Sequence, residues 1–235
     1  MNAVPVLAAV VSVAGAVVTV VLGAVFERRR TRAQRRAQLR HLASRYSVPL
    51  LQAAHSLRGR LGNTVPEQIK EFREGSDRFR DYARHETLYR MAHYLCIVQI
   101  MWREVDFLDL GRRKHNRELI KRLVAVGSAI GNREFGPFLV LGGEQRAIGD
   151  LMVDPDSPKD APPQCLTYPQ FRDRLREDTH FANWFKPLLD DIDAVITSAT
   201  IPPRLAHVTA ALDELIQFLD KRKIGLPWAE APAVS

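Results

Sequence analysis

Hydrophobic residues follow two different patterns along this chain. Residues 3–26 contain no charged side chain, whereas from residue 46 onward apolar positions recur every three or four residues, as they do on one face of an α-helix. No run alternates between apolar and polar residues as a strand would. The chain is therefore predicted to be all-α, with helices at residues 50–61, 66–79, 86–111, 117–130, 143–153, 169–177, 179–198 and 202–222.

The predicted helices form a bundle over residues 46–222. The stretch 86–111 is apolar on most sides through its middle, which is typical of a central helix. Residues 154–164 contain four prolines and are predicted to be a loop. Asn116 is expected to cap the helix that follows it. The residues of that helix expected to face the core are Leu119, Ile120, Leu123, Val124 and Ala125.

Residues 3–26 predict a membrane-spanning helix. A helix of these 24 residues is about 36 Å long, enough for a hydrocarbon core of about 30 Å. A cleaved signal peptide would have a shorter apolar stretch with positive charge before it. A buried core helix is the alternative, but the arginines that follow at once weigh against it. We therefore expect a transmembrane anchor at residues 1–27.

The positive charge of the protein is concentrated beside this anchor. The chain has a net charge of +7, and residues 27–45 contain eight arginines and one acid, which leaves 26 basic and 26 acidic side chains in residues 46–235. This balance argues against nucleic-acid binding by the domain. A basic flank keeps its side of a span in the cytoplasm. We expect a single-pass protein of the inner (plasma) membrane, with the N-terminus outside and the C-terminal domain cytoplasmic.

Two further interactions are expected at the membrane. A basic juxtamembrane helix at residues 28–45 is expected to lie on anionic lipid, although a solvated linker helix would look similar in sequence. Small residues three and four apart in the span favour a homodimer, although such residues are common in any span. The lipid-facing residues are Arg28, Arg29, Arg30, Arg32, Arg35, Arg36 and Arg40, and the self-association face is Ser12, Gly15, Thr19 and Gly23. Residues 223–235 form a C-terminal tail.

The chain lacks the motifs of the common enzyme classes. It contains no Walker loop, GxGxxG, GxSxG or HExxH pattern, so we predict no catalytic residue, metal site or cofactor and favour a protein that is not an enzyme. Glu177 and His180 have the spacing of one of the two acid–histidine pairs that a helical two-metal site needs, but the sequence lacks a second such pair. Cys96 and Cys165 are expected to be free thiols in the cytoplasm. His93 lies one turn from Cys96, but the apolar setting favours an inert core thiol over a nucleophile.

The candidate ligand site lies at the start of the helix predicted after Gly142 and Gly143. The first N–H groups of a helix lack partners within the helix and attract anions. The residues assigned to this site are Arg133, Glu144, Gln145 and Arg146. Over this ligand site the sequence favours a structural interpretation, in which Arg133 and Arg146 join Glu134 or Asp150 in a buried polar network.

Three stretches carry a resemblance to a known family. They are WREVDFLDLG at 102–111, EQRAIGDLM at 144–152 and LDELIQFLD at 212–220. In this order they resemble an uncharacterised family of bacterial proteins with one N-terminal span and a helical cytoplasmic domain. The resemblance covers residues 46–220 and implies a shared fold without an activity.

The sequence thus favours a membrane-anchored cytoplasmic interaction or regulatory module. Its expected partners are the lipid bilayer, a second copy of the chain and an unidentified protein. The alternative is a membrane-tethered enzyme, or a sensor of a small anionic ligand, that uses a polar site around Glu144 and Arg146.

Overall fold

The computed structural model describes residues 46–62, 66–105, 113–158, 160, 162–198 and 200–220, together with Glu27. The chain divides into two units, Met1–Ala43 and Ser44–Ser235, and the helical domain is a single unit within the second. The predicted anchor, the juxtamembrane arginines, the small-residue face and the tail at 223–235 lie outside the described residues. Within the described residues, no helix is both long enough and apolar enough to cross a membrane.

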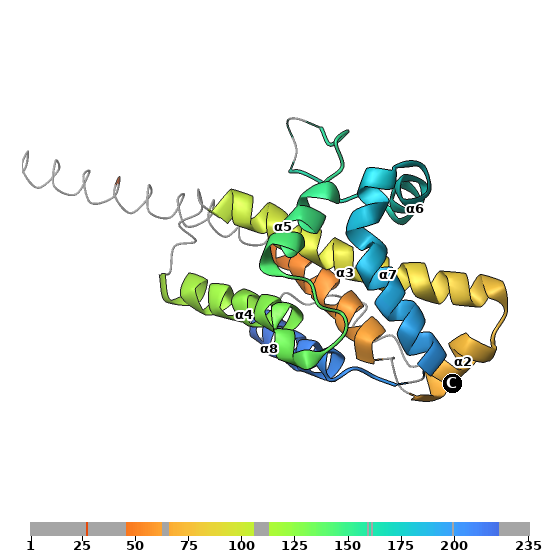
Figure 1. The fold of residues 1–235 in the computed structure, drawn as a ribbon. Coiled ribbons are helices and arrows are strands. Elements are labelled where there is room, and N and C mark those ends of the chain that lie inside the picture. The colour runs from red at the N-terminus through yellow and green to blue at the C-terminus, as the bar shows by residue number, and fades with distance from the viewer. Residues whose placement is uncertain are drawn as a thin grey trace, which may run out of the picture. The chain divides into compact units, whose positions relative to one another are not determined.

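The regular structure is helical wherever the chain is described, except for one isolated bridge between Val153 and Cys165. This confirms the all-α prediction. Figure 1 shows the helices in chain order. They are an unlabelled helix at residues 46–62, α2 (Pro66–Glu74), α3 (Asp77–Val105), α4 (Arg113–Gly131), the short 3₁₀ helix η1 (Arg133–Phe135), α5 (Gly142–Leu151), α6 (Tyr168–Glu177), α7 (Thr179–Ser198) and α8 (Pro203–Asp220).

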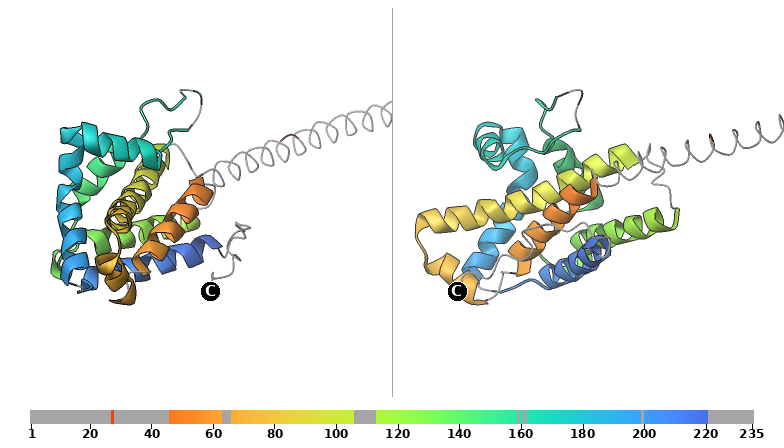
Figure 2. Two further views of the ribbon diagram at one scale, coloured as in Figure 1. Left: turned by 90° about the vertical axis from the view of Figure 1, so that its right-hand side faces the viewer. Right: turned by 180° about the vertical axis from the view of Figure 1, so that it is seen from behind.

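The longest helix, α3, is the central element of the domain, as predicted. It contacts α2, α5, α6 and α7, whereas α4 packs mainly along α8 (Figures 1 and 2). Its buried residues lie on several sides of the helix and include Leu88, Met91, Leu95, Cys96 and Ile100. The helix begins at Asp77, earlier than predicted, because the charged residues before Glu86 continue the helix although they carry little apolar signal.

Two expectations for α4 are wrong. The helix begins at Arg113, so Asn116 lies inside it and is not its cap. From residue 117 onward, where its side chains are described, the buried residues are Leu123, Val126 and Ile130, whereas Val124 is 53% exposed and Ala125 is exposed as well. The inward face is therefore rotated from the predicted one, since α4 buries only the side that rests on its neighbours.

The last helix follows its prediction closely. All six residues of the predicted α8 stripe are buried: Leu205, Val208, Leu212, Leu215, Ile216 and Leu219. Arg204, one turn before Val208, is also completely buried. Burial of that much apolar surface on one face explains why α8 is a stable part of the core.

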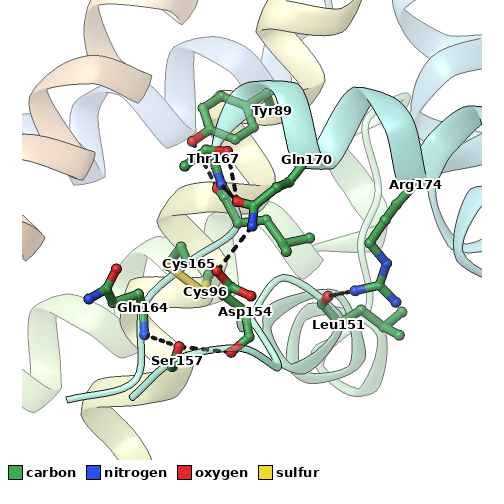
Figure 3. The surroundings of a disulfide bond; sticks show 11 residues. Tyr89, Cys96, Leu151, Asp154, Ser157, Gln164, Cys165, Thr167, Gln170 and Arg174 are labelled. Carbon is green, nitrogen blue, oxygen red and sulfur yellow. Dashed lines mark hydrogen bonds between the residues drawn. A yellow bond between two sulfur atoms is a disulfide. The ribbon is translucent and has the colours of Figure 1, made fainter. Parts of the chain in front are cut away.

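A disulfide joins Cys96 of α3 to Cys165, which corrects the prediction of two free thiols. Figure 3 shows its surroundings. The proline-rich loop returns beside its own beginning, since Asp154 N–H donates to the carbonyl oxygen of Gln164 and Leu166 N–H donates to that of Met152, both at 2.8 Å. Cys165 is thereby placed with its Cα 6.2 Å from that of Cys96. A sulfur bonded in this way is no nucleophile, so the Cys96–His93 pair has no catalytic role in this state.

Candidate functional site

A cavity of about 880 Å³ lies between α3, α4 and the beginning of α5. Its volume is in the range of pockets that enclose small ligands. The apolar part of its wall is made of Tyr94, Leu95, Val98, Trp102, Leu123 and Val124. The polar part is made of Gln99, Arg103, Ser128, Asn132, Gln145 and Arg146, with Gly127, Gly131 and Gly142 between them.

The two long walls of the cavity are held by different neighbours. The α5 helix packs closely on α3, because a Cβ at Gly149 would lie only 2.8 Å from the carbonyl oxygen of Leu95. The α4 helix packs instead along α8. As a result α3 and α4, which are consecutive in the chain, face one another across the cavity.

Gln145 fixes the corner where α4 and α5 meet. Its amide nitrogen donates to the carbonyl oxygens of Gly127 at 2.9 Å and Val140 at 2.8 Å. The side chain rests on glycines of α4: a Cβ at Gly127 would lie 3.1 Å from the Gln145 amide oxygen, and a Cβ at Gly131 would lie 3.2 Å from its nitrogen. Gln145 therefore ties the cavity wall together, and its amide hydrogens are not free for a ligand.

Arg204 of α8 supports the same corner from behind. Its guanidinium donates four hydrogen bonds, of 2.6–3.2 Å, to backbone carbonyl oxygens of Ala129, Ile130, Gly136 and Pro137. Two of these carbonyls belong to the last turn of α4, where helical partners are missing. Burial lowers the pKa of Arg204, and the nearby charge of Asp191 opposes that shift.

The segment between η1 and α5 is fixed on its other side by Asp191. The N–H of Phe138 donates to the Asp191 carboxylate at 2.7 Å. Phe138 has a φ of 64°, an uncommon value for a bulky residue that persists where the surroundings enforce it. Arg204 and Asp191 together determine where α5 begins, and so they position the residues at the mouth of the cavity.

The predicted ligand residues have different roles in the structure. Gln145 and Arg146 line the cavity, but Arg133 does not. Arg133 is exposed on η1. Glu144 accepts a hydrogen bond from the N–H of Leu141 at 2.7 Å, which satisfies one unpaired group at the start of α5.

The predicted buried network of these arginines is wrong. Arg133 and Arg146 are both exposed, and neither forms an ion pair with a residue that the structure describes. Asp150 pairs instead with Arg103 of α3, with 2.6 Å between the nitrogen and the oxygen. Arg146 therefore has an uncompensated positive charge at the edge of the cavity.

Arg103 and Tyr94 are cavity residues that the sequence did not indicate. Tyr94 is 2% exposed, and its hydroxyl has no hydrogen-bond partner in the described part of the protein. Burial raises the pKa of this hydroxyl, so it stays a neutral donor. A buried donor of this kind is expected to find an acceptor.

No protein-family model matches the chain, and no curated protein or solved structure matches it. In the described residues no three His, Cys, Asp or Glu side chains gather as a metal site would require. Glu177, half of the sequence pair considered for a metal, pairs with Arg176 at 2.9 Å. The cavity is therefore the feature on which a functional proposal rests.

Proposed function

We propose that the protein is a membrane-anchored regulatory module whose helical domain binds a small ligand in the cavity between α3, α4 and α5. The cavity itself carries this proposal. Its volume of about 880 Å³, its largely apolar wall and its few polar groups are the features that small-ligand sites share. Occupancy would then alter how the domain contacts a protein partner or a second copy of the chain.

Surface character supports a ligand site over a broad protein-docking face. A module that only docks proteins exposes a contiguous apolar patch. Among the described residues, the large apolar side chains exposed by more than a third are Phe79, Tyr82, Val124 and Trp184. Val124 belongs to the cavity wall, and the others are divided between α3 and α7.

The membrane anchor and the cytoplasmic placement of the domain are part of the same proposal. The uncharged run at residues 3–26 and the arginines that follow it support a span with its C-terminal side inside. The resemblance to bacterial proteins with one span and a helical domain supports the same layout. Extraction of cell membranes with alkaline carbonate tests the anchor: the protein is expected to stay in the pellet, and release into the supernatant would contradict it.

A cavity-filling variant tests ligand binding. Ser128 lies in the cavity wall and is exposed, so Ser128→Trp is expected to fill the space without unfolding α4. Ala125 is exposed on the same helix outside the cavity, and Ala125→Trp is the matched control. Both variants and the wild-type full chain, held in phosphatidylcholine nanodiscs, are screened by thermal unfolding against a library of small metabolites.

The expected result is a compound that raises the melting temperature of the wild type and of Ala125→Trp but not of Ser128→Trp. If no compound stabilises the wild type, or if Ser128→Trp responds equally, the cavity is not a ligand site.

A further inference from the structure

Both charged side chains among the described residues of the cavity wall are basic. They are Arg103 and Arg146, and none of the described lining residues is a carboxylate. Arg103 is compensated by Asp150, which leaves the positive charge of Arg146. Gly142, the first residue of α5, also lies in the wall, but the Glu144 carboxylate already faces the positive end of that helix, so the preference for an anion rests on Arg146.

The rest of the wall suits an apolar group. Leu95, Val98 and Trp102 line one side along α3, and Leu123 and Val124 line the other along α4. Val124 is 53% exposed, and covering such a side chain with an apolar ligand is favourable. An anion with a wholly polar body would leave this surface in contact with water.

We propose that the cavity binds an amphipathic anion, with the apolar body between α3 and α4 and the anionic group at Arg146. This inference rests on the ligand-binding function proposed above and names the chemical class of the ligand. The unpaired guanidinium supplies a charge-assisted contact.

A pair of probes with one shape separates the charge from the apolar body. The probes are 2-naphthoate and the neutral 2-naphthamide, titrated calorimetrically into the full chain in phosphatidylcholine nanodiscs, with empty nanodiscs as the blank. We expect 2-naphthoate to bind about 10-fold or more tightly than 2-naphthamide, since a hydrogen bond to a charged group contributes more than a neutral one. Added salt should narrow this difference, because Arg146 is exposed.

Three variants locate the contacts. Arg146→Ala is expected to weaken 2-naphthoate by about 10-fold and to leave 2-naphthamide unchanged. Arg133→Ala, which removes an exposed arginine outside the cavity wall, is expected to change neither. Tyr94→Phe, which removes a hydroxyl that is buried away from solvent, is a second control and is expected to leave both affinities unchanged.

The outcomes distinguish the two proposals. Equal binding of the two probes, blocked by Ser128→Trp, would overturn the anion preference and leave the ligand site standing. Binding of neither probe to the cavity would overturn the amphipathic class, and if the metabolite screen also failed, the ligand-binding function itself. Replacing a third of the nanodisc lipid by phosphatidylglycerol identifies the source of the anion: competition with 2-naphthoate indicates a lipid, and its absence indicates a soluble compound.

Discussion

Gly149 of α5 lies directly against Gln99 of α3. A Cβ at position 149 would be 2.8 Å from the Cβ of Gln99 and 2.8 Å from the carbonyl oxygen of Leu95, distances that real Cβ atoms do not adopt. The two helices approach this closely because Gly149 has no side chain. Since α5 and α3 both line the cavity, this contact helps to set the shape of the proposed ligand site.

A methyl group at this position is therefore expected to destabilise the protein. Gly149→Ala should lower the free energy of unfolding by about 1–3 kcal/mol through overpacking, although alanine is the better helix former. Gly143→Ala is the control, because a Cβ at Gly143 has no atom within 4 Å. Thermal unfolding followed by circular dichroism should place Gly149→Ala below the wild type and Gly143→Ala level with it or above. The reverse order would contradict the close approach of α5 to α3.

Loss of the buried guanidinium at Arg204 should have a larger effect. Arg204→Met removes the guanidinium donor of four carbonyl oxygens, of which, within the described part of the chain, only that of Ile130 keeps another donor, the Val140 N–H. The loss is expected to cost about 3–5 kcal/mol and to lower the melting temperature by roughly 6–20 °C. Arg204→Lys is expected to be nearly as damaging, because an ammonium group lacks the planar fork of donors. The exposed Arg133 provides the control, and Arg133→Met should change stability by less than about 0.5 kcal/mol.

The disulfide is expected to stabilise the domain by about 2–4 kcal/mol, since it closes a long stretch of chain. A reducing agent should lower the melting temperature of the wild type to that of Cys165→Ala. The variant itself should be insensitive to the reductant. Equal melting temperatures for oxidised wild type, reduced wild type and variant would show that the bond between Cys96 and Cys165 contributes no stability.

The same cysteines report on the side of the membrane that the domain faces. Stable disulfides are typical of oxidising compartments, whereas cytoplasmic cysteine pairs are kept reduced or change with redox conditions. The experiment quenches growing cells in acid and labels the protein under denaturing conditions with a maleimide polymer. The proposed cytoplasmic placement predicts that a substantial fraction of Cys96 and Cys165 is then found reduced. A population that is fully oxidised in all conditions would contradict that placement.

Stability should also fall in mildly acidic solution because of His93. Burial, with a contribution from the charge of Arg90, lowers the pKa of His93 in the folded protein, whereas the unfolded value is about 6.5. Between these values the unfolded chain binds more protons, so stability is lost as the pH falls below about 6.5. His93→Gln should flatten this part of the profile of melting temperature against pH, and His180→Gln, at an exposed position, should not.

Much of the helical structure could be predicted from the sequence, and the exceptions have physical causes. The stripes of α7 and α8 are wide and regular, so their bounds were close to the predicted ones. In α4 the apolar residues Leu123, Val124 and Val126 lie within four positions of one another. Their spacing alone does not show which side chains pack against neighbouring helices and which face a cavity. The early start of α3 is not evident from the sequence, because Asp77–His85 carries many charges and its residues 77–82 form an exposed part of the helix.

The candidate site was predicted in part. Gln145 and Arg146 were found because a glycine pair and a helix start are local features. Tyr94 and Arg103 lie on α3, and only the packing of α5 on that helix brings them to the same cavity. Arg204 had a signal that was overlooked: it stands one turn before Val208 in line with the apolar stripe of α8. The sequence does not predict the disulfide, because a cytoplasmic compartment favours free thiols.

The position of Arg204 in the chain has a consequence for biosynthesis. The guanidinium of Arg204 supports the α4–α5 corner, but Arg204 follows Ile130 by 74 residues and belongs to the last described helix. It therefore leaves the ribosome after all the residues that line the cavity. Until then the carbonyl oxygens of Ala129 and Ile130 lack their bonds from Arg204, and the apolar face that α8 covers is open to solvent. A nascent or truncated chain without α8 therefore exposes apolar surface of the kind that promotes aggregation, and the support of the cavity wall is complete only after α8 has packed on α4.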